Sequence, residues 1–112
     1  MRAQRFSHYR LMWIVVFFDL PTDEKEDRFV YTQFRKSLLK NGFAMFQFSV
    51  YIRHCASREN AEVHLKRIKR SLPDRGKTSI LCITDKQFET MEIFHGFSKS
   101  PTPQGIKQLE MF

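Results

Sequence analysis

The sequence has few of the residues that build a disulfide scaffold, a zinc finger or a membrane protein. Its 112 residues include two cysteines, Cys55 and Cys82, without a metal-binding spacing. We therefore expect both to be reduced, small and partly buried. A hydrophobic run over residues 12–18 is too short to span a membrane, and no small-residue cleavage site follows it. These features predict a cytoplasmic protein without a membrane span.

The size of the chain limits its core, and its charge limits its partners. A chain of 112 residues predicts one domain with much surface. Twelve phenylalanines are many for such a small core, so we expect an apolar surface that a partner buries. The formal net charge of +7 favours nucleic acid or another anionic surface as a partner. The sequence contains no internal repeat.

The hydrophobic run over residues 12–18 is predicted to be a strand buried on both faces, because it is rich in β-branched and aromatic residues. Pro21 cannot donate to a β-ladder, so pairing should stop near it. The strand ends at Asp19, a carboxylate held where a buried strand emerges. Two interpretations remain open: Asp19 is a catalytic or metal-binding acid, or it caps the following turn.

Two amphipathic helices are predicted, over residues 23–40 and 57–72, because apolar side chains recur every three or four residues in each. Asp23 and Glu26 have capping-box spacing at the start of the first helix. The polar faces carry basic residues, which either are solvated or contact phosphate groups. On the first helix these are Lys25, Arg28, Arg35 and Lys36.

The rest of the chain is predicted to be extended or turned. Residues 43–53 form one bent strand or two strands joined near residues 47–49, and the sequence leaves both open. Residues 78–84 are predicted to be another buried strand, residues 85–89 a turn, and residues 91–94 a short last strand.

This order of elements predicts an α+β fold of the ferredoxin-like βαββαβ type, with both helices on one face of the sheet. Because the first strand is apolar on both faces, a second copy is the simplest cover for the other face, which predicts a homodimer through the sheet faces. By alternation Asp19 shares that face with Val15 and Phe17. The two Asp19 carboxylates would then approach each other across a two-fold axis.

We expect the domain to occupy residues 12–95, after a basic N-terminal arm over residues 1–11. Residues 96–112 are expected to form a linker and an apolar docking tail, with a frayed end as the alternative.

Four segments give the chain a resemblance to a known family. They are residues 17–22, the helix and its exit from Tyr31 to Phe43, residues 47–51, and residues 83–88. In this order and spacing, the chain resembles the CRISPR-associated protein two family, the small subunit of CRISPR adaptation. It looks closest to members that accompany Cas9-type effectors.

The resemblance implies a ferredoxin-like homodimer in which Asp19 is the Mg²⁺ ligand and the catalytic acid. It also implies a partner, the CRISPR integrase, two dimers of which flank one dimer of this family. Together they capture duplex DNA and insert it into the repeat array. Family members are also described as metal-dependent endonucleases that cleave single-stranded RNA or duplex DNA. The two expected functions are therefore an adaptation subunit and, as the alternative, a magnesium-dependent endonuclease.

Several residues bear on this choice. Phe18 stands where many relatives carry Tyr, and Met45 where some carry a basic residue. Both departures weaken the prediction of a nuclease more than the prediction of a scaffold.

His54 and His95 are remote candidates for proton transfer, whereas His64 is expected on the surface, as is His8. An RNA-recognition module would also place aromatics on a four-stranded sheet, but its aromatic and glycine consensus is missing here.

Overall fold

The structure is a computed structural model, and it describes residues 11–103. The predictions for the arm over residues 1–10 and for the tail after residue 103 lie outside the described residues. Nine elements follow one another along the chain. They are β1 (Met12–Asp19), α1 (Lys25–Lys40), β2 (Ala44–Gln47), β3 (Val50–Cys55), α2 (Arg58–Arg70), β4 (Lys77–Thr84), α3 (Asp85–Phe88), β5 (Ile93–His95) and β6 (Ser98–Ser100).

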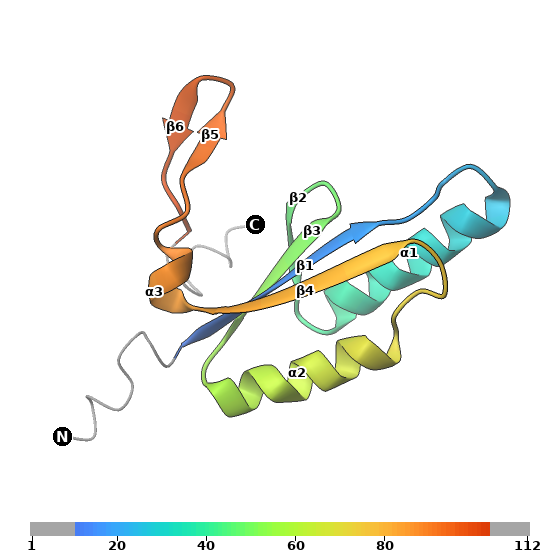
Figure 1. Cartoon of the computed structure of the whole chain (residues 1–112), viewed down its shortest axis with the longest axis horizontal. Coiled ribbons are helices and arrows are strands. Elements are labelled where there is room, and N and C mark those ends of the chain that lie inside the picture. Colours follow the sequence, from blue (N-terminus) through green and yellow to red (C-terminus); the bar gives the residue numbers. More distant parts are fainter. Residues whose placement is uncertain (1–10, 104–112) are drawn as a thin grey trace.

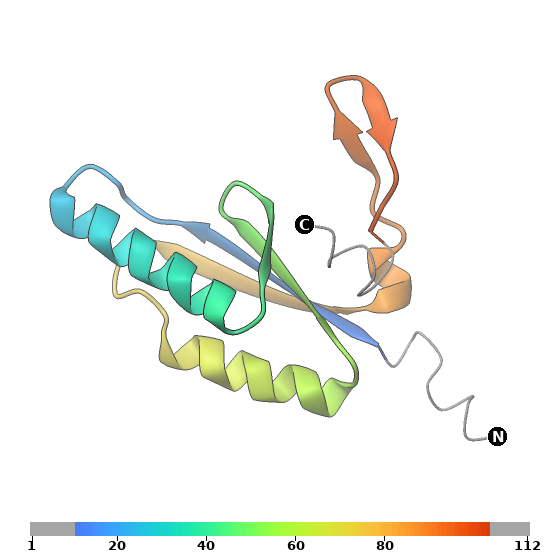
Figure 2. The same ribbon diagram turned by 180° about the vertical axis from the view of Figure 1, so that it is seen from behind.

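Four strands form one antiparallel sheet in the order β2-β3-β1-β4, with β1 in the centre. Val16 of β1 lies opposite Tyr51 on β3 and opposite Ile80 on β4. Helices α1 and α2 both lie on one side of this sheet (Figures 1 and 2). The α+β, ferredoxin-like fold class is thereby confirmed. No helix between residues 11 and 103 is long and apolar enough to cross a membrane.

The alternation predicted for β1 is confirmed by the packing on its two faces. Ile14, Val16 and Phe18 are buried against the helices, in one core with Phe34 of α1 and Ile68 of α2. The other face of β1 carries Trp13, Val15, Phe17 and Asp19. Helix α1 begins at Lys25 with Glu24 as its N-cap, so the Asp23–Glu26 capping box predicted from spacing is shifted by one residue along the chain.

Residues 43–53 form two strands, which resolves the alternative left open by the sequence. A two-residue connection, Phe48-Ser49, joins β2 to β3, and Ser49 has the left-handed φ of 62°. The carbonyl oxygen of Ser49 accepts a hydrogen bond of 3.1 Å from the amide of Phe18. The tight turn therefore rests on the end of β1, where it helps to form the wall of a pocket.

The segment after β4 is a one-turn helix, α3, where the sequence predicted a turn. Thr84 and Gln87 form a capping box, and Phe88 stacks on Trp13 with ring centroids 4.0 Å apart. This contact buries Trp13 and Val15 within the same chain. At this end of the sheet the cover is therefore α3 of the same chain, and not the second copy expected as the simplest cover of this face. Towards the other end Phe17 is 41% exposed, and on β4 Leu81, the ladder partner of Val15, is 48% exposed.

The last two strands form a separate hairpin. The strand predicted over residues 91–94 is β5, Ile93–His95, and it pairs with a further strand, β6, instead of the four-stranded sheet. The hairpin thus crosses residue 96, where the linker was expected to begin. It stands away from the sheet and the two long helices (Figure 1). An isolated two-stranded hairpin is only marginally stable in water, and Phe94 and Phe97 on it are 55% and 105% exposed.

Candidate functional site

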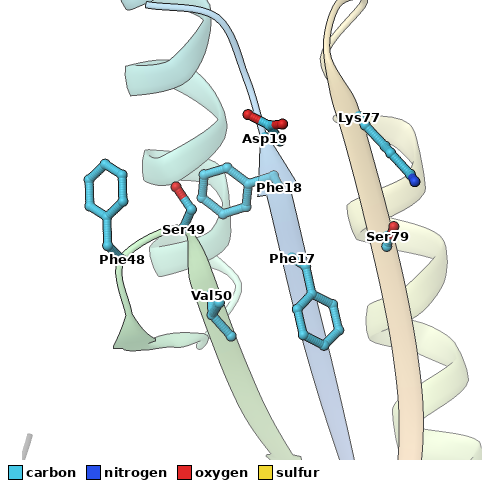
Figure 3. A pocket seen from close by; sticks show the side chains of 8 residues that line it. All are labelled: Phe17, Phe18, Asp19, Phe48, Ser49, Val50, Lys77 and Ser79. Atoms are coloured by element: carbon cyan, nitrogen blue, oxygen red, sulfur yellow. The ribbon is translucent and has the colours of Figure 1, made fainter. Parts of the chain in front are cut away.

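An open pocket of about 320 Å³ lies at the end of β1, on the sheet face away from α1 and α2. Its side chains come from β1, β3, β4 and the turn between β2 and β3 (Figure 3). The pocket has an apolar floor and a polar end, at which Asp19 and Lys77 lie. The lining residues are Phe17, Phe18, Asp19, Phe48, Ser49, Val50, Lys77 and Ser79.

Asp19 and Lys77 are partners at the last position of the β1–β4 ladder. Side chains directly opposite each other in an antiparallel pair leave the same face of the sheet. Both residues are exposed, and within residues 11–103 neither forms an ion pair or a side-chain hydrogen bond. The site thus presents two residues of opposite charge that are neighbours on the ladder, do not pair with each other, and are available to a ligand.

The turn between β2 and β3 forms one wall of the pocket. The hydroxyl groups of Tyr31 and Ser49 lie 3.3 Å apart and share a hydrogen bond, and the ring of Phe48 stacks on Tyr31 at 6.2 Å. Phe48 is nevertheless 79% exposed. The wall therefore offers a large apolar surface beside Asp19, although its polar hydroxyl is already engaged.

The metal-binding capacity of one chain is small. Among the described residues, no three His, Cys, Asp or Glu side chains gather into a group that could hold a metal ion. Of the carboxylates in the described part of the chain, Asp19 alone lines the pocket. Mg²⁺ is commonly held by one or two carboxylates together with waters and substrate phosphates. The donor set would therefore fit Mg²⁺ held by one carboxylate, Asp19, with waters and a phosphate completing the coordination.

The four basic residues predicted as phosphate contacts all lie on α1, and none lines the pocket. Lys25 and Lys36 are exposed, without a hydrogen bond in the described part of the chain. Arg28 donates to the carbonyl oxygens of Thr22 and Asp23, at 3.2 and 2.9 Å, and so stabilises the loop after β1. Arg35 donates to the Tyr51 hydroxyl at 3.1 Å.

The histidines are not brought to Asp19. His54, with a side chain only 5% exposed, has Nε2 placed 3.4 Å from Oδ1 of Asp85. Burial lowers the pKa of His54, and the nearby Asp85 carboxylate opposes this shift. His64 was expected on the surface, but it is buried, and its Nε2 accepts a hydrogen bond of 2.8 Å from Arg53. His95 is exposed on β5.

Sequence reasoning missed Lys77, the cation nearest to Asp19 along the ladder. Lys77 directly precedes the predicted strand over residues 78–84, and the register that pairs it with Asp19 is set by the loop before β4. The Gly76-Lys77 sequence was the available signal, since a glycine at a strand entry often marks close backbone approach.

Comparison of the sequence with known proteins identifies a family. Residues 12–91 match the family described as "CRISPR associated protein Cas2". The "CRISPR-associated endoribonuclease Cas2" of Flavobacterium psychrophilum is 56% identical over 108 residues, which cover 96% of this chain and 94% of the relative. The protein of the same name from Parvibaculum lavamentivorans is 50% identical over 101 residues, or 90% of this chain and all of the relative. A third, from Paracidovorax avenae, is 44% identical over 104 residues, with 93% and 96% covered. The matched region, and the identity along nearly the full length of these relatives, show that the chain belongs to the Cas2 family of CRISPR-associated proteins.

Proposed function

We propose that this chain is the small subunit of a CRISPR adaptation complex. In this role it forms a homodimer in the cytoplasm, binds duplex DNA, and bridges two dimers of the CRISPR integrase during spacer acquisition. The observation that supports this most directly is the half of the sheet that α3 leaves open. There Phe17 is 41% exposed in the pocket that Asp19 and Lys77 line, and Leu81, further along β4, is 48% exposed.

The open half of the sheet favours a second copy as its cover. Burying a large apolar side chain stabilises an assembly by about 1.5–3 kcal/mol before the costs of association are subtracted. Strand β4 is an edge strand, so its outer backbone groups lack a ladder partner within the described sheet. The protruding hairpin, with exposed Phe94 and Phe97, needs a surface to pack on. A partner copy supplies cover for all three features.

Duplex DNA is the proposed ligand because the net charge is +7 and α1 carries a basic outer surface. Contacts to phosphates orient a duplex without reading its sequence. Lys25 and Lys36 are available for such contacts. Arg28 and Arg35 contribute through the guanidinium N–H groups that are not already bonded to the loop carbonyls or to the Tyr51 hydroxyl. Replacing Lys25 by Ala should flatten the salt dependence of duplex binding. Replacing Arg28 by Ala should flatten it and also loosen the loop after β1.

A second candidate function is magnesium-dependent cleavage of single-stranded RNA or duplex DNA. Two observations favour it: the relatives carry the word endoribonuclease in their names, and Asp19 is exposed within a pocket. A bound Mg²⁺ would supply a polarised water and neutralise charge on the phosphate. The chain's own part would be to hold the ion through Asp19. Among residues 11–103 no histidine lines the pocket to move a proton, which favours the scaffold over the nuclease.

One pair of assays separates the two functions. Asp19→Ala is compared with Asp23→Ala, which removes an exposed acid that does not line the pocket. Integration of a duplex is measured with the integrase present, and cleavage of RNA and DNA is measured with the purified protein in Mg²⁺. The scaffold predicts that both variants support integration. Cleavage by wild type that is lost only in Asp19→Ala would establish the nuclease, and failure of wild type to support integration would refute the scaffold.

A further inference from the structure

We propose that Lys77 holds a phosphate of the nucleic-acid backbone beside Asp19. This inference rests on the proposed function, because it concerns the same site. It adds Lys77 as a positioning residue and gives the two side chains different roles. Asp19 serves the cation, and Lys77 serves the phosphodiester.

The position of Lys77 is fixed by the residue before it. Gly76 has a φ of +72°, and a Cβ there would lie 2.5 Å from the backbone oxygen of Asp19. Only glycine lets the chain pass so close to the end of β1 in this conformation. The close approach starts β4 directly alongside Asp19 and sets the register in which Asp19 faces Lys77.

A second contact holds the same loop from the other side. The Nη1 of Arg75 donates to Oδ1 of Asp27 on α1 at 2.9 Å, and its Nε donates to Asp74 at 3.0 Å. The hydrogen bond from Arg75 lowers the pKa of the Asp27 carboxyl, so the contact persists in mildly acidic solution. Arg75 is thus engaged in holding the loop. Lys77, at the start of β4, remains the cation that is available to a ligand.

The charge pattern suits a phosphodiester. A carboxylate alone repels a phosphate, and an adjacent ammonium group offsets this repulsion. Lysine acts as a compact point charge with freely rotating donors, which allows it to follow a backbone phosphate without a fixed bidentate geometry. Because Lys77 forms no ion pair in the described part of the chain, its charge remains available to a ligand (Figure 3).

The place of the pair in the sheet keeps it reachable. Asp19 ends β1 and Lys77 begins β4, so both lie at the end of the ladder rather than in its middle. Both residues are exposed in the single chain. A dimer would therefore present two carboxylates and two lysines near its two-fold axis, an arrangement that fits the phosphates of a duplex DNA.

The test measures duplex binding in the absence of divalent metal, so that cleavage plays no part. Binding of a fluorescent duplex of arbitrary sequence is followed across a series of salt concentrations for wild type, Lys77→Ala, Lys77→Arg and Lys99→Ala. The last variant removes the same charge from the hairpin, where Lys99 is already paired with Glu92 at 3.2 Å. Each phosphate contact contributes about 0.9 to the slope of log K against log salt.

Lys77→Ala should make this slope less steep, by about 0.9 for each engaged lysine. Lys77→Arg should have the wild-type slope, and so should Lys99→Ala. A slope that Lys77→Ala leaves unchanged both with the duplex and with a single-stranded RNA would overturn the inference while leaving the proposed function intact, provided that wild type binds. A wild type that binds neither the duplex nor a single-stranded RNA would overturn both. A loss confined to the RNA probe supports the role of Lys77 and identifies RNA as the source of the phosphate.

Discussion

Trp13 and Asp85 are 72 residues apart in the chain, yet the indole Nε1 of Trp13 donates a hydrogen bond of 2.6 Å to Oδ1 of Asp85. Asp85 is the first residue of α3, and its carboxylate is buried at 8% exposure. Phe88, one turn later, stacks on the same indole. These two contacts fasten α3 to the sheet and so set where the β5–β6 hairpin leaves the domain.

We expect Trp13→Phe to destabilise the fold through this hydrogen bond as well as through lost packing. Leaving a buried acceptor without its donor costs about 1–3 kcal/mol. Urea denaturation measures the effect, with Trp13→Phe made in the wild type and in an Asp85→Ala background. The substitution should cost clearly less in the Asp85→Ala background. An equal cost in both would show that the hydrogen bond contributes nothing to stability.

Stability should fall on mild acidification because of two buried histidines. Burial lowers the pKa of His54 and of His64 below the ordinary value of 6.5. The unfolded chain then takes up protons at a higher pH than the folded chain, so the free energy of unfolding decreases as pH falls through 6.5 and below. The charged groups near these rings are Asp85 beside His54, Arg67 beside His64, and Arg53 beside both.

His54→Gln removes one of these titrations and should make the pH dependence of stability shallower. Denaturation series between about pH 7.5 and about pH 5 measure this slope. His95→Gln, on an exposed strand of the hairpin, serves as the control and should retain the wild-type slope. If His54→Gln and wild type lose stability in parallel, the ring of His54 titrates alike in both states.

Gly76→Ala should be costly for two separable reasons, and Gly96→Ala isolates one of them. Both glycines have positive φ, at +72° and +63°, which costs an L-residue roughly 1–2 kcal/mol. Only at Gly76 would the new Cβ meet backbone, 2.5 Å from the oxygen of Asp19, whereas nothing lies within 4 Å at Gly96. Thermal unfolding should therefore show a clearly larger loss for Gly76→Ala. Equal losses would mean that the close approach to β1 is easily relieved.

The architecture could be read from the sequence where periodicity is strong. The strand over residues 12–19, the two helices, and their placement on one face follow from apolar spacing and from the handedness of crossovers. The alternation within β1 also places Asp19 on the face away from the helices. These features depend on local patterns, which a single sequence carries.

The features that sequence reasoning missed depend on contacts between distant residues. The four residues of α3 are too few for a periodic signal, and the helix is fixed by Trp13, which is far away in the chain. His64 has ordinary polar neighbours in sequence, and its burial depends on Arg53 from β3. Lys77 lies beside Asp19 only because Gly76 allows the backbone of β4 to approach β1.

We propose that the open half of the sheet joins two copies of the chain. Phe17, on this half, is 41% exposed, and Phe29, on the helical side, is 63% exposed. Replacing Phe17 by Glu should disrupt the pairing, because it would place a charge in an apolar interface. Replacing Phe29 by Glu is the matched control.

Light scattering on the purified protein is the most direct measurement. It should give twice the mass of one chain for wild type and for Phe29→Glu, and the mass of a single chain for Phe17→Glu. A wild type that scatters as one chain at micromolar concentration would contradict the account.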